Sequence, residues 1–123
     1  MIKQICSRLE VAHRNDVDKI IENEVRLQAG KKFIECRLKS SAEYQASKQN
    51  QDAGTILNET VTAKMKHDRD SFFIKFPLQE FILRLHTDTG VIIIVGSQDY
   101  PAKMTLNTDK EYINLTFKAS SPA

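Results

Sequence analysis

Alternation between apolar and polar residues dominates the second half of the chain. Over residues 55–66, every second position from Leu57 onward is mostly apolar, and the positions between them are polar. The same period of two recurs over residues 81–86, 102–106 and 112–118. This period is typical of a strand that buries one face and exposes the other. The second half therefore predicts a set of antiparallel strands.

Residues 91–95 contain only valine and isoleucine. An uninterrupted β-branched run predicts a central strand that is buried on both faces. Turn-forming residues at 87–90 precede it and predict a hairpin with the strand at 81–86. Residues 81–119 then form a meander of four antiparallel strands, and residues 120–123 form a frayed tail. The predicted apolar face comprises Leu57, Val61, Met65, Phe81, Leu83, Leu85, Ile93, Met104, Ile113, Leu115 and Phe117.

The first half has a less regular pattern. Apolar residues between positions 17 and 25 stand at helical spacing behind a candidate cap, but residues 2–27 as a whole also fit an extended conformation. Of these two interpretations we favour the extended one. Residues 32–38 predict a further strand. Its inward-facing residues are expected to be Ile34, Cys36 and Leu38.

Residues 40–54 read SSAEYQASKQNQDAG, a polar segment in which Tyr44 is the one large side chain. Such a segment predicts a long flexible loop or an extended hairpin that reaches away from the core. We interpret it as an arm that is mobile in the isolated protein and ordered in an assembly, with Tyr44 as the anchor. A passive solvated loop is the alternative.

Residues 67–77 break the strand pattern and contain an aromatic cluster with Phe72 and Phe73. They predict one short helix that ends before Pro77. The cluster is expected in the core, or at an interface if part of it is exposed. The chain is thus one domain, with N-terminal strands over 1–39, the polar loop or arm over 40–54, and the meander over 55–119. The fold class is mainly β: an antiparallel β-sandwich or barrel-like domain with one short helix and a long polar loop.

Composition narrows the function classes. The 123 residues are 41% hydrophobic and 28% charged, which argues against a disordered chain. A net charge of +2 gives no electrostatic case for nucleic acid, so no nucleic-acid partner is expected. The longest apolar run has five residues, and charges interrupt the first fourteen positions. We therefore expect neither a membrane span nor a signal peptide, and folding in a cytoplasm.

The residue types that carry catalysis or bind metals are sparse. The three histidines have no ligand spacing, and His86, at a strand end, is interpreted as a surface hairpin residue. Gly96 and Ser97 lack the remaining residues of a phosphate loop and are interpreted as a turn. Cys6 and Cys36 are expected as free thiols, although a single disulfide stays open. We expect no catalytic residue, no metal site and no cofactor.

Three segments together resemble a family. They are the small-residue turn that runs from Asp52 and Gly54 into a long strand, the apolar strand followed by residues 96–102 with Tyr100, and the terminal strand over 115–121. Over roughly the last seventy residues their order resembles small structural proteins of phages and prophages from Bacteroides-like bacteria, of the tail type. The resemblance implies a β-rich subunit that assembles into rings through strand edges and long loops.

The sequence therefore predicts a non-enzymatic structural protein of a phage or prophage tail. Its partners are expected to be itself, as a homo-oligomer in the assembly, and other phage structural proteins, with its final location in the virion. The alternative is a small ligand- or protein-binding β module, such as an accessory protein of a mobile element. An enzyme ranks third. The candidate interface residues are Tyr44, Asp52, Gly54, Phe72, Phe73 and Tyr100.

Overall fold

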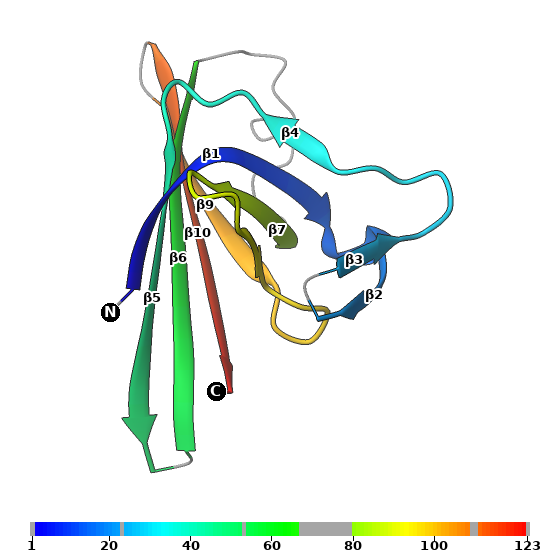
Figure 1. Ribbon diagram of the computed structural model, residues 1–123, viewed down its shortest axis with the longest axis vertical. Coiled ribbons are helices and arrows are strands. Elements are labelled where there is room, and N and C mark those ends of the chain that lie inside the picture. Colours follow the sequence, from blue (N-terminus) through cyan, green and yellow to red (C-terminus); the bar gives the residue numbers. More distant parts are fainter. Residues whose placement is uncertain (1, 23, 53, 67–79, 109–110, 123) are drawn as a thin grey trace.

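The computed structural model describes residues 2–22, 24–52, 54–66, 80–108 and 111–122. It confirms a mainly β, antiparallel, barrel-like fold (Figure 1). The elements are β1 (Ile2–His13), a 3-10 turn η1 (Arg14–Asp16), β2 (Val17–Ile21), β3 (Glu24–Leu27), β4 (Ile34–Cys36), β5 (Ala42–Gln51), β6 (Gly54–Lys66), β7 (Glu80–Thr87), β8 (Ile92–Val95), β9 (Ala102–Thr108) and β10 (Tyr112–Pro122).

Strand pairing closes a ring. The order of the main sheet is β4-β1-β5-β6-β10-β9-β7-β8, and β1 also pairs with β7. The ring therefore runs β1-β5-β6-β10-β9-β7 and returns to β1, while β4 and β8 flank it. Closure removes most of the unpaired strand edges from the body of the protein.

The barrel interior holds the main apolar core. Alternate residues of every ring strand point inward, as a period of two requires. Phe81 and Phe117 lie at its centre with their rings 6.0 Å apart, edge to face. Every residue of the apolar face predicted from the sequence belongs to this cluster or packs against it.

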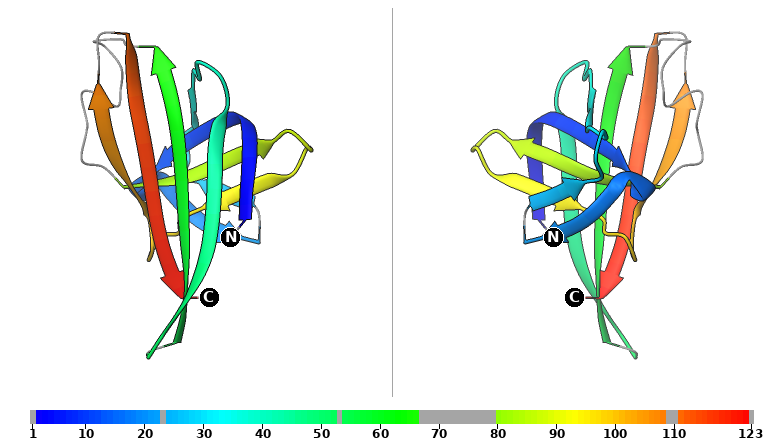
Figure 2. Two further views of the ribbon diagram at one scale, coloured as in Figure 1. Left: turned by 90° about the vertical axis from the view of Figure 1, so that its left-hand side faces the viewer. Right: turned by 90° about the vertical axis from the view of Figure 1, so that its right-hand side faces the viewer.

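A second apolar cluster covers the outer face of β1 and β7. Ala12 and Ile82 point outward from these two strands and pack against Val17 and Val25 of the β2–β3 hairpin. Figure 2 shows this hairpin beside the barrel. β1 and β7 are therefore buried on both faces, which explains why residues 81–83 are continuously apolar. The extended interpretation of the first 27 residues is confirmed for β1, β2 and β3, and only the three residues of η1 are helical among the described ones.

Within the polar segment 40–54, residues 42–51 form strand β5, so the interpretation as a flexible loop is wrong. β5 pairs with β6 from Glu43↔Thr62 to Gln51↔Gly54. Of the two structures predicted for the segment, the extended hairpin is the one that forms. Main-chain pairing with the long β6 orders a sequence whose side chains have little strand preference.

Two other features of the second half differ from prediction. β8 pairs only with β7 among the described strands, and Val91 and Ile92 are 53% and 39% exposed. Its Ile93 and Ile94 contact the two different clusters, so the β-branched run belongs to a flanking strand and not to a central one. β9 pairs with β7 at Glu80 and Phe81 as well as with β10, so residues 81–119 are not a simple meander.

Three further expectations concern chain segments. β10 continues to Pro122 because β6 is long enough to pair with it, so residues 120–122 belong to a strand and not to a frayed tail. Of the three residues expected to face inward near β4, Cys36 is buried and Leu38 packs against the core, whereas Ile34 is 39% exposed although it lies on the same side of the strand as Cys36. The short helix expected near 67–77 lies outside the described residues.

Gly96 follows the last residue of β8 and lies close to the backbones of β7 and β9. The turn expected at Gly96 and Ser97 is confirmed by a 3.0 Å hydrogen bond from the Ser97 N–H to the Tyr100 carbonyl. Gly96 has φ +91°, and a Cβ there would lie 3.0 Å from the Ala102 nitrogen and 3.1 Å from the Phe81 carbonyl oxygen. Glycine at this position therefore allows β8 and β9 to pair one after the other along the same edge of β7.

Gly96→Ala is expected to cost about 2–4 kcal/mol of unfolding free energy, from the positive φ and the backbone clash together. Gly90→Ala is the matched control because Gly90 has φ +86°, but a Cβ added there would meet nothing within 4 Å. Urea unfolding of both variants separates the two contributions. An equal loss in both would show that the close approach at Gly96 does not matter.

Candidate functional site

Tyr44 lies in the barrel interior and is 7% exposed. It alternates in phase with Ala42 and Ala46, which are also buried, so its predicted role as an exposed anchor is wrong. Its hydroxyl donates a 2.6 Å hydrogen bond to Oε2 of Glu59 on β6. Burial raises the pKa of Glu59, and the bond from Tyr44 opposes this rise. Tyr44 thus acts as the partner of a buried carboxyl group.

The other predicted interface residues lie on the surface or outside the described chain. Asp52 and Gly54 are exposed in the turn between β5 and β6. Tyr100 is 45% exposed in the loop before β9. Phe72 and Phe73 lie outside the described residues.

Three strands continue past the end of the barrel and form a projecting blade, which we define as residues 47–51 of β5, 54–58 of β6 and 119–122 of β10. Figures 1 and 2 show these ends extending beyond the barrel, with the β5–β6 turn farthest out. β1 pairs with β5 only as far as Ala46, and β9 pairs with β10 only as far as Lys118. Among the described strands, both outer edges of the blade are therefore unpaired.

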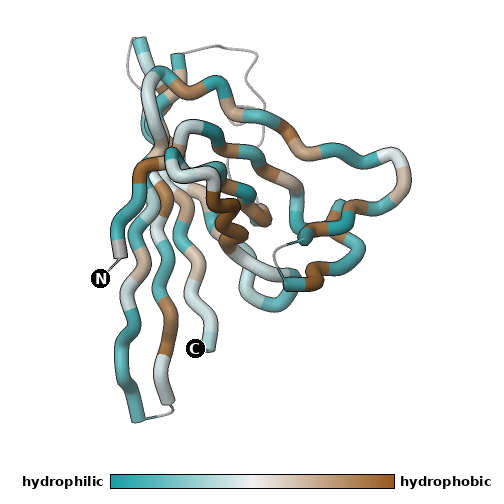
Figure 3. Tube along the Cα trace, in the orientation of Figure 1, coloured by the Kyte–Doolittle hydropathy of each residue, from teal (hydrophilic) through white to brown (hydrophobic). Residues whose placement is uncertain are grey.

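The blade has a polar surface. Residues 47–51 are all exposed, and Figure 3 shows this part of β5 as hydrophilic beside a hydrophobic stretch of β6. The stretch in β6 is Ile56 and Leu57, both half-buried. Unpaired N–H and C=O groups attract another strand, whereas polar side chains and Lys48 limit irreversible aggregation.

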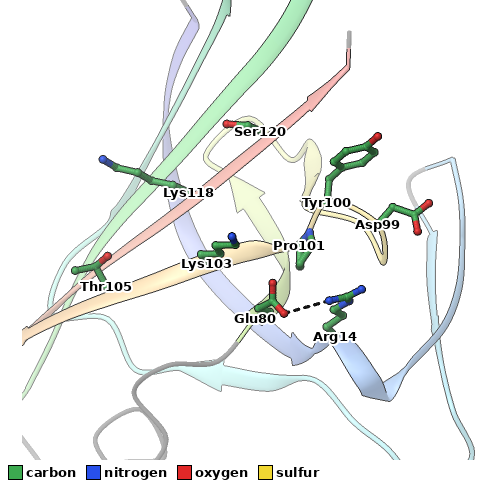
Figure 4. A pocket seen from close by; sticks show the side chains of 9 residues that line it. All are labelled: Arg14, Glu80, Asp99, Tyr100, Pro101, Lys103, Thr105, Lys118 and Ser120. Atoms are coloured by element: carbon green, nitrogen blue, oxygen red, sulfur yellow. Dashed lines mark hydrogen bonds and ion pairs between the residues drawn. The ribbon is translucent and has the colours of Figure 1, made fainter.

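A groove lies where the blade meets the barrel. Its volume is about 470 Å³, and Figure 4 shows the side chains that line it. They come from η1, from the loop before β9, and from β7, β9 and β10. The lining residues are Arg14, Glu80, Asp99, Tyr100, Pro101, Lys103, Thr105, Lys118 and Ser120.

Strand register places the charged groups of the groove in one row. Lys118 of β10 is the direct cross-strand partner of Lys103 of β9, and Lys103 is the partner of Glu80 of β7. Their neighbours along each strand face the core, so all three point outward. Two like charges directly opposite each other destabilise a sheet. The lysine pair is therefore unfavourable for the fold alone.

The acidic groups of the groove are Asp99 and Glu80, the cross-strand partner of Lys103. Glu80 accepts a 3.1 Å hydrogen bond from Arg14, so these two charges neutralise each other. Figure 4 shows Asp99 at the opposite end of the groove from Lys118. Within the described chain, no carboxylate forms an ion pair with Lys103 or Lys118. This end of the groove is cationic and open to an anion.

A buried carboxylate that the sequence did not single out is Glu10. Its oxygens accept two 3.0 Å bonds from the Arg84 guanidinium, and His86 Nε2 lies 2.7 Å from Oε1. Burial opposes ionisation, but the bonds from Arg84 and His86 and the nearby charges of Arg84 and Arg8 outweigh it and lower the pKa of Glu10. His86 therefore belongs to a charge network, which differs from the surface hairpin position that its sequence context predicts.

This network covers the outer face of β1 and β7 and has a structural role. Glu10 and Arg84 are cross-strand partners, and the ring of Phe33 lies 4.0 Å from the guanidinium carbon. The bidentate pair occupies the carboxylate fully. The sequence contains one signal for this network, the opposite charges of Glu10 and Arg84. That signal can be used only when β1 and β7 are known to pair, which the sequence does not show.

The remaining reactive residue types form no further site. Cys6 and Cys36 are free and buried, as predicted, and burial raises the pKa of Cys36 to about 12. Over the described residues, no group of three or more His, Cys, Asp or Glu side chains is placed to hold a metal ion. No helix in the same residues is long and apolar enough to cross a membrane.

No protein-family model, characterised protein or solved structure matches this chain.

Glu59→Gln is expected to stabilise the protein near neutral pH. The raised pKa of Glu59 means that the folded protein holds this proton more tightly than the unfolded chain, so stability falls as pH rises above the ordinary glutamate pKa. The variant keeps an oxygen for the Tyr44 hydroxyl and removes the charge. Thermal melts near pH 7 and about pH 4 are expected to show a gain at the higher pH only. The exposed Asp18→Asn is the control, and an equal shift at both pH values would exclude the proposed cause.

Glu10→Gln is expected to cost about 2–3 kcal/mol because it leaves the Arg84 guanidinium without its charged partner. The lowered pKa of Glu10 gives the opposite pH dependence: its stabilisation is present above the ordinary glutamate pKa and is lost as pH falls through the folded value. Glu35→Gln breaks the exposed 2.8 Å pair with Arg8 and should cost about 0–1 kcal/mol. If urea unfolding shows the same loss of unfolding free energy for Glu10→Gln and Glu35→Gln, the Glu10 ion pair contributes no more than an exposed one.

Proposed function

We propose that this chain is a non-enzymatic assembly subunit that associates with other copies through the projecting blade. The observation that carries the proposal is the pair of unpaired edges, residues 47–51 of β5 and 119–122 of β10, on strands that extend past a closed barrel. An edge of this kind adds a strand from a partner through main-chain hydrogen bonds. The hydrogen bonds come from the backbone, so the polar sequence of the blade does not prevent pairing.

The other sheet edges are shorter or differently placed. β4 has three residues, and β8 has four that lie beside the barrel body. The blade combines two free edges with a turn that projects from the molecule (Figure 2). This geometry favours contact with a neighbouring subunit over binding of a small molecule in the barrel.

The resemblance of the last seventy residues to tail-type structural proteins supports a finer proposal, a subunit of a phage or prophage tail that is made in the cytoplasm and ends in the virion. Its further partners would then be other structural proteins of the particle. The alternative class, a ligand- or protein-binding β module, is supported by the groove beside the blade.

Shortening the blade tests the proposal. Removal of Gln49, Asn50, Thr55 and Ile56 deletes two cross-strand pairs and preserves which face each remaining residue occupies. The barrel core is unchanged, so the thermal melt should shift little. Sedimentation velocity over a range of concentrations should show self-association of the parent and its loss in the shortened protein.

Ile92→Thr provides the control because it alters an exposed apolar residue on β8, an edge strand outside the blade. This variant should associate like the parent. Association that survives the shortened blade, or that depends on Ile92 instead, would refute the proposal.

A further inference from the structure

The cationic end of the groove has a charge imbalance that the described residues do not correct. Lys103 and Lys118 face each other across β9 and β10, and both are exposed. Arg14, the third cation, already binds Glu80 at 3.1 Å. A carboxylate placed between the two ammonium groups would remove their repulsion and form charge-assisted hydrogen bonds.

The tip of the blade carries a carboxylate without a partner. Asp52 is exposed in the β5–β6 turn, and it forms no ion pair within the described part of the chain. Its neighbours in β5 are neutral from Gln49 to Gln51. The tip therefore presents a single negative charge on a narrow hairpin.

The tip cannot reach the groove of its own chain. Thr60 is the cross-strand partner of Lys118, and six positions of β6 separate Thr60 from Gly54 at the turn. At the rise of a strand this corresponds to about 20 Å, along a hairpin that points away from the barrel. Figure 1 shows the ends of β5 and β6 pointing away from the barrel. Only a second copy can bring Asp52 to the lysine pair.

We propose that the groove of one copy receives the β5–β6 tip of the next copy, with Asp52 bound between Lys103 and Lys118. The inference rests on the proposed function and names the surface that receives the blade. Ser120 lines the groove and also belongs to the free edge of β10, so an incoming hairpin meets the edge and the cationic end together. Tyr100 provides an exposed aromatic surface at the same site.

The contact is head to tail because tip and groove are different surfaces. Such a contact generates a ring when the rotation between copies closes, or a filament when it does not. Because the attraction is between exposed charges, the association should weaken as salt concentration rises.

A charge exchange tests the inference by sedimentation velocity. Two altered proteins are first measured separately: Asp52→Lys, and the double variant Lys103→Glu with Lys118→Glu. The association affinity of each should fall at least about tenfold below that of the parent. An equimolar mixture should restore association, since the altered tip of one protein fits the altered groove of the other, and the two native surfaces still match. Asp88→Lys makes the same charge change at the β7–β8 turn and should leave association intact.

If the double variant melts far below the parent, Lys118→Glu replaces it, because this change puts opposite charges face to face across β9 and β10. Parent-like association of the charge variants, or a mixture that stays dissociated, would overturn the groove contact; if the shortened blade still abolishes association, the proposed function stands. A parent that remains monomeric at every concentration would overturn both.

Discussion

The antiparallel pairing of β1 with β7 is the contact on which the rest of the structure depends. It runs from Cys6↔Thr87 to His13↔Phe81 and closes the strands β1-β5-β6-β10-β9-β7 into a ring. Both faces of this pair are buried, one by the barrel core and the other by the β2–β3 hairpin. Loss of this pairing would open the barrel and expose both apolar clusters together, so the domain should unfold as one unit.

Closure also determines where strand edges remain free. The ring pairs its strands only over the height of the barrel, whereas β6 has thirteen residues and β10 has eleven. Their excess length, with the end of β5, becomes the blade. The groove arises at the same boundary, where β9 stops accompanying β10 at Lys118. The blade and the groove are therefore two consequences of one mismatch in strand length.

The sequence predicted the strands well where one face alone is buried, as in β6, β9 and β10, because the period of two is then visible in the residues. It failed for β5, where the inward residues Ala42, Tyr44 and Ala46 alternate correctly but stand in a polar composition typical of a loop. It also predicted wrongly that β8 is a central strand. A β-branched run indicates that a strand makes apolar contacts, but it does not indicate how many strands pair with it. Pairing partners depend on register between distant segments, which a local pattern does not contain.

The candidate site was only partly predictable for the same reason. Tyr100, which lines the groove, is among the interface residues predicted from the sequence, but the groove also joins Arg14, Glu80, Lys103 and Lys118, which are up to 104 positions apart in the chain. Each lysine, taken alone, occupies an ordinary solvated position of a strand. Their repulsive pairing appears only when β9 and β10 are placed side by side.

Amide hydrogen exchange at low and high protein concentration tests the central claim most directly, because it reports which edge becomes paired. The account predicts that protection increases with concentration at residues 47–51 of β5 and 119–121 of β10, while amides of the β1–β7 pair stay unchanged. Protection that increases at β8 instead, or blade amides that exchange at the same rate at both concentrations, would contradict it.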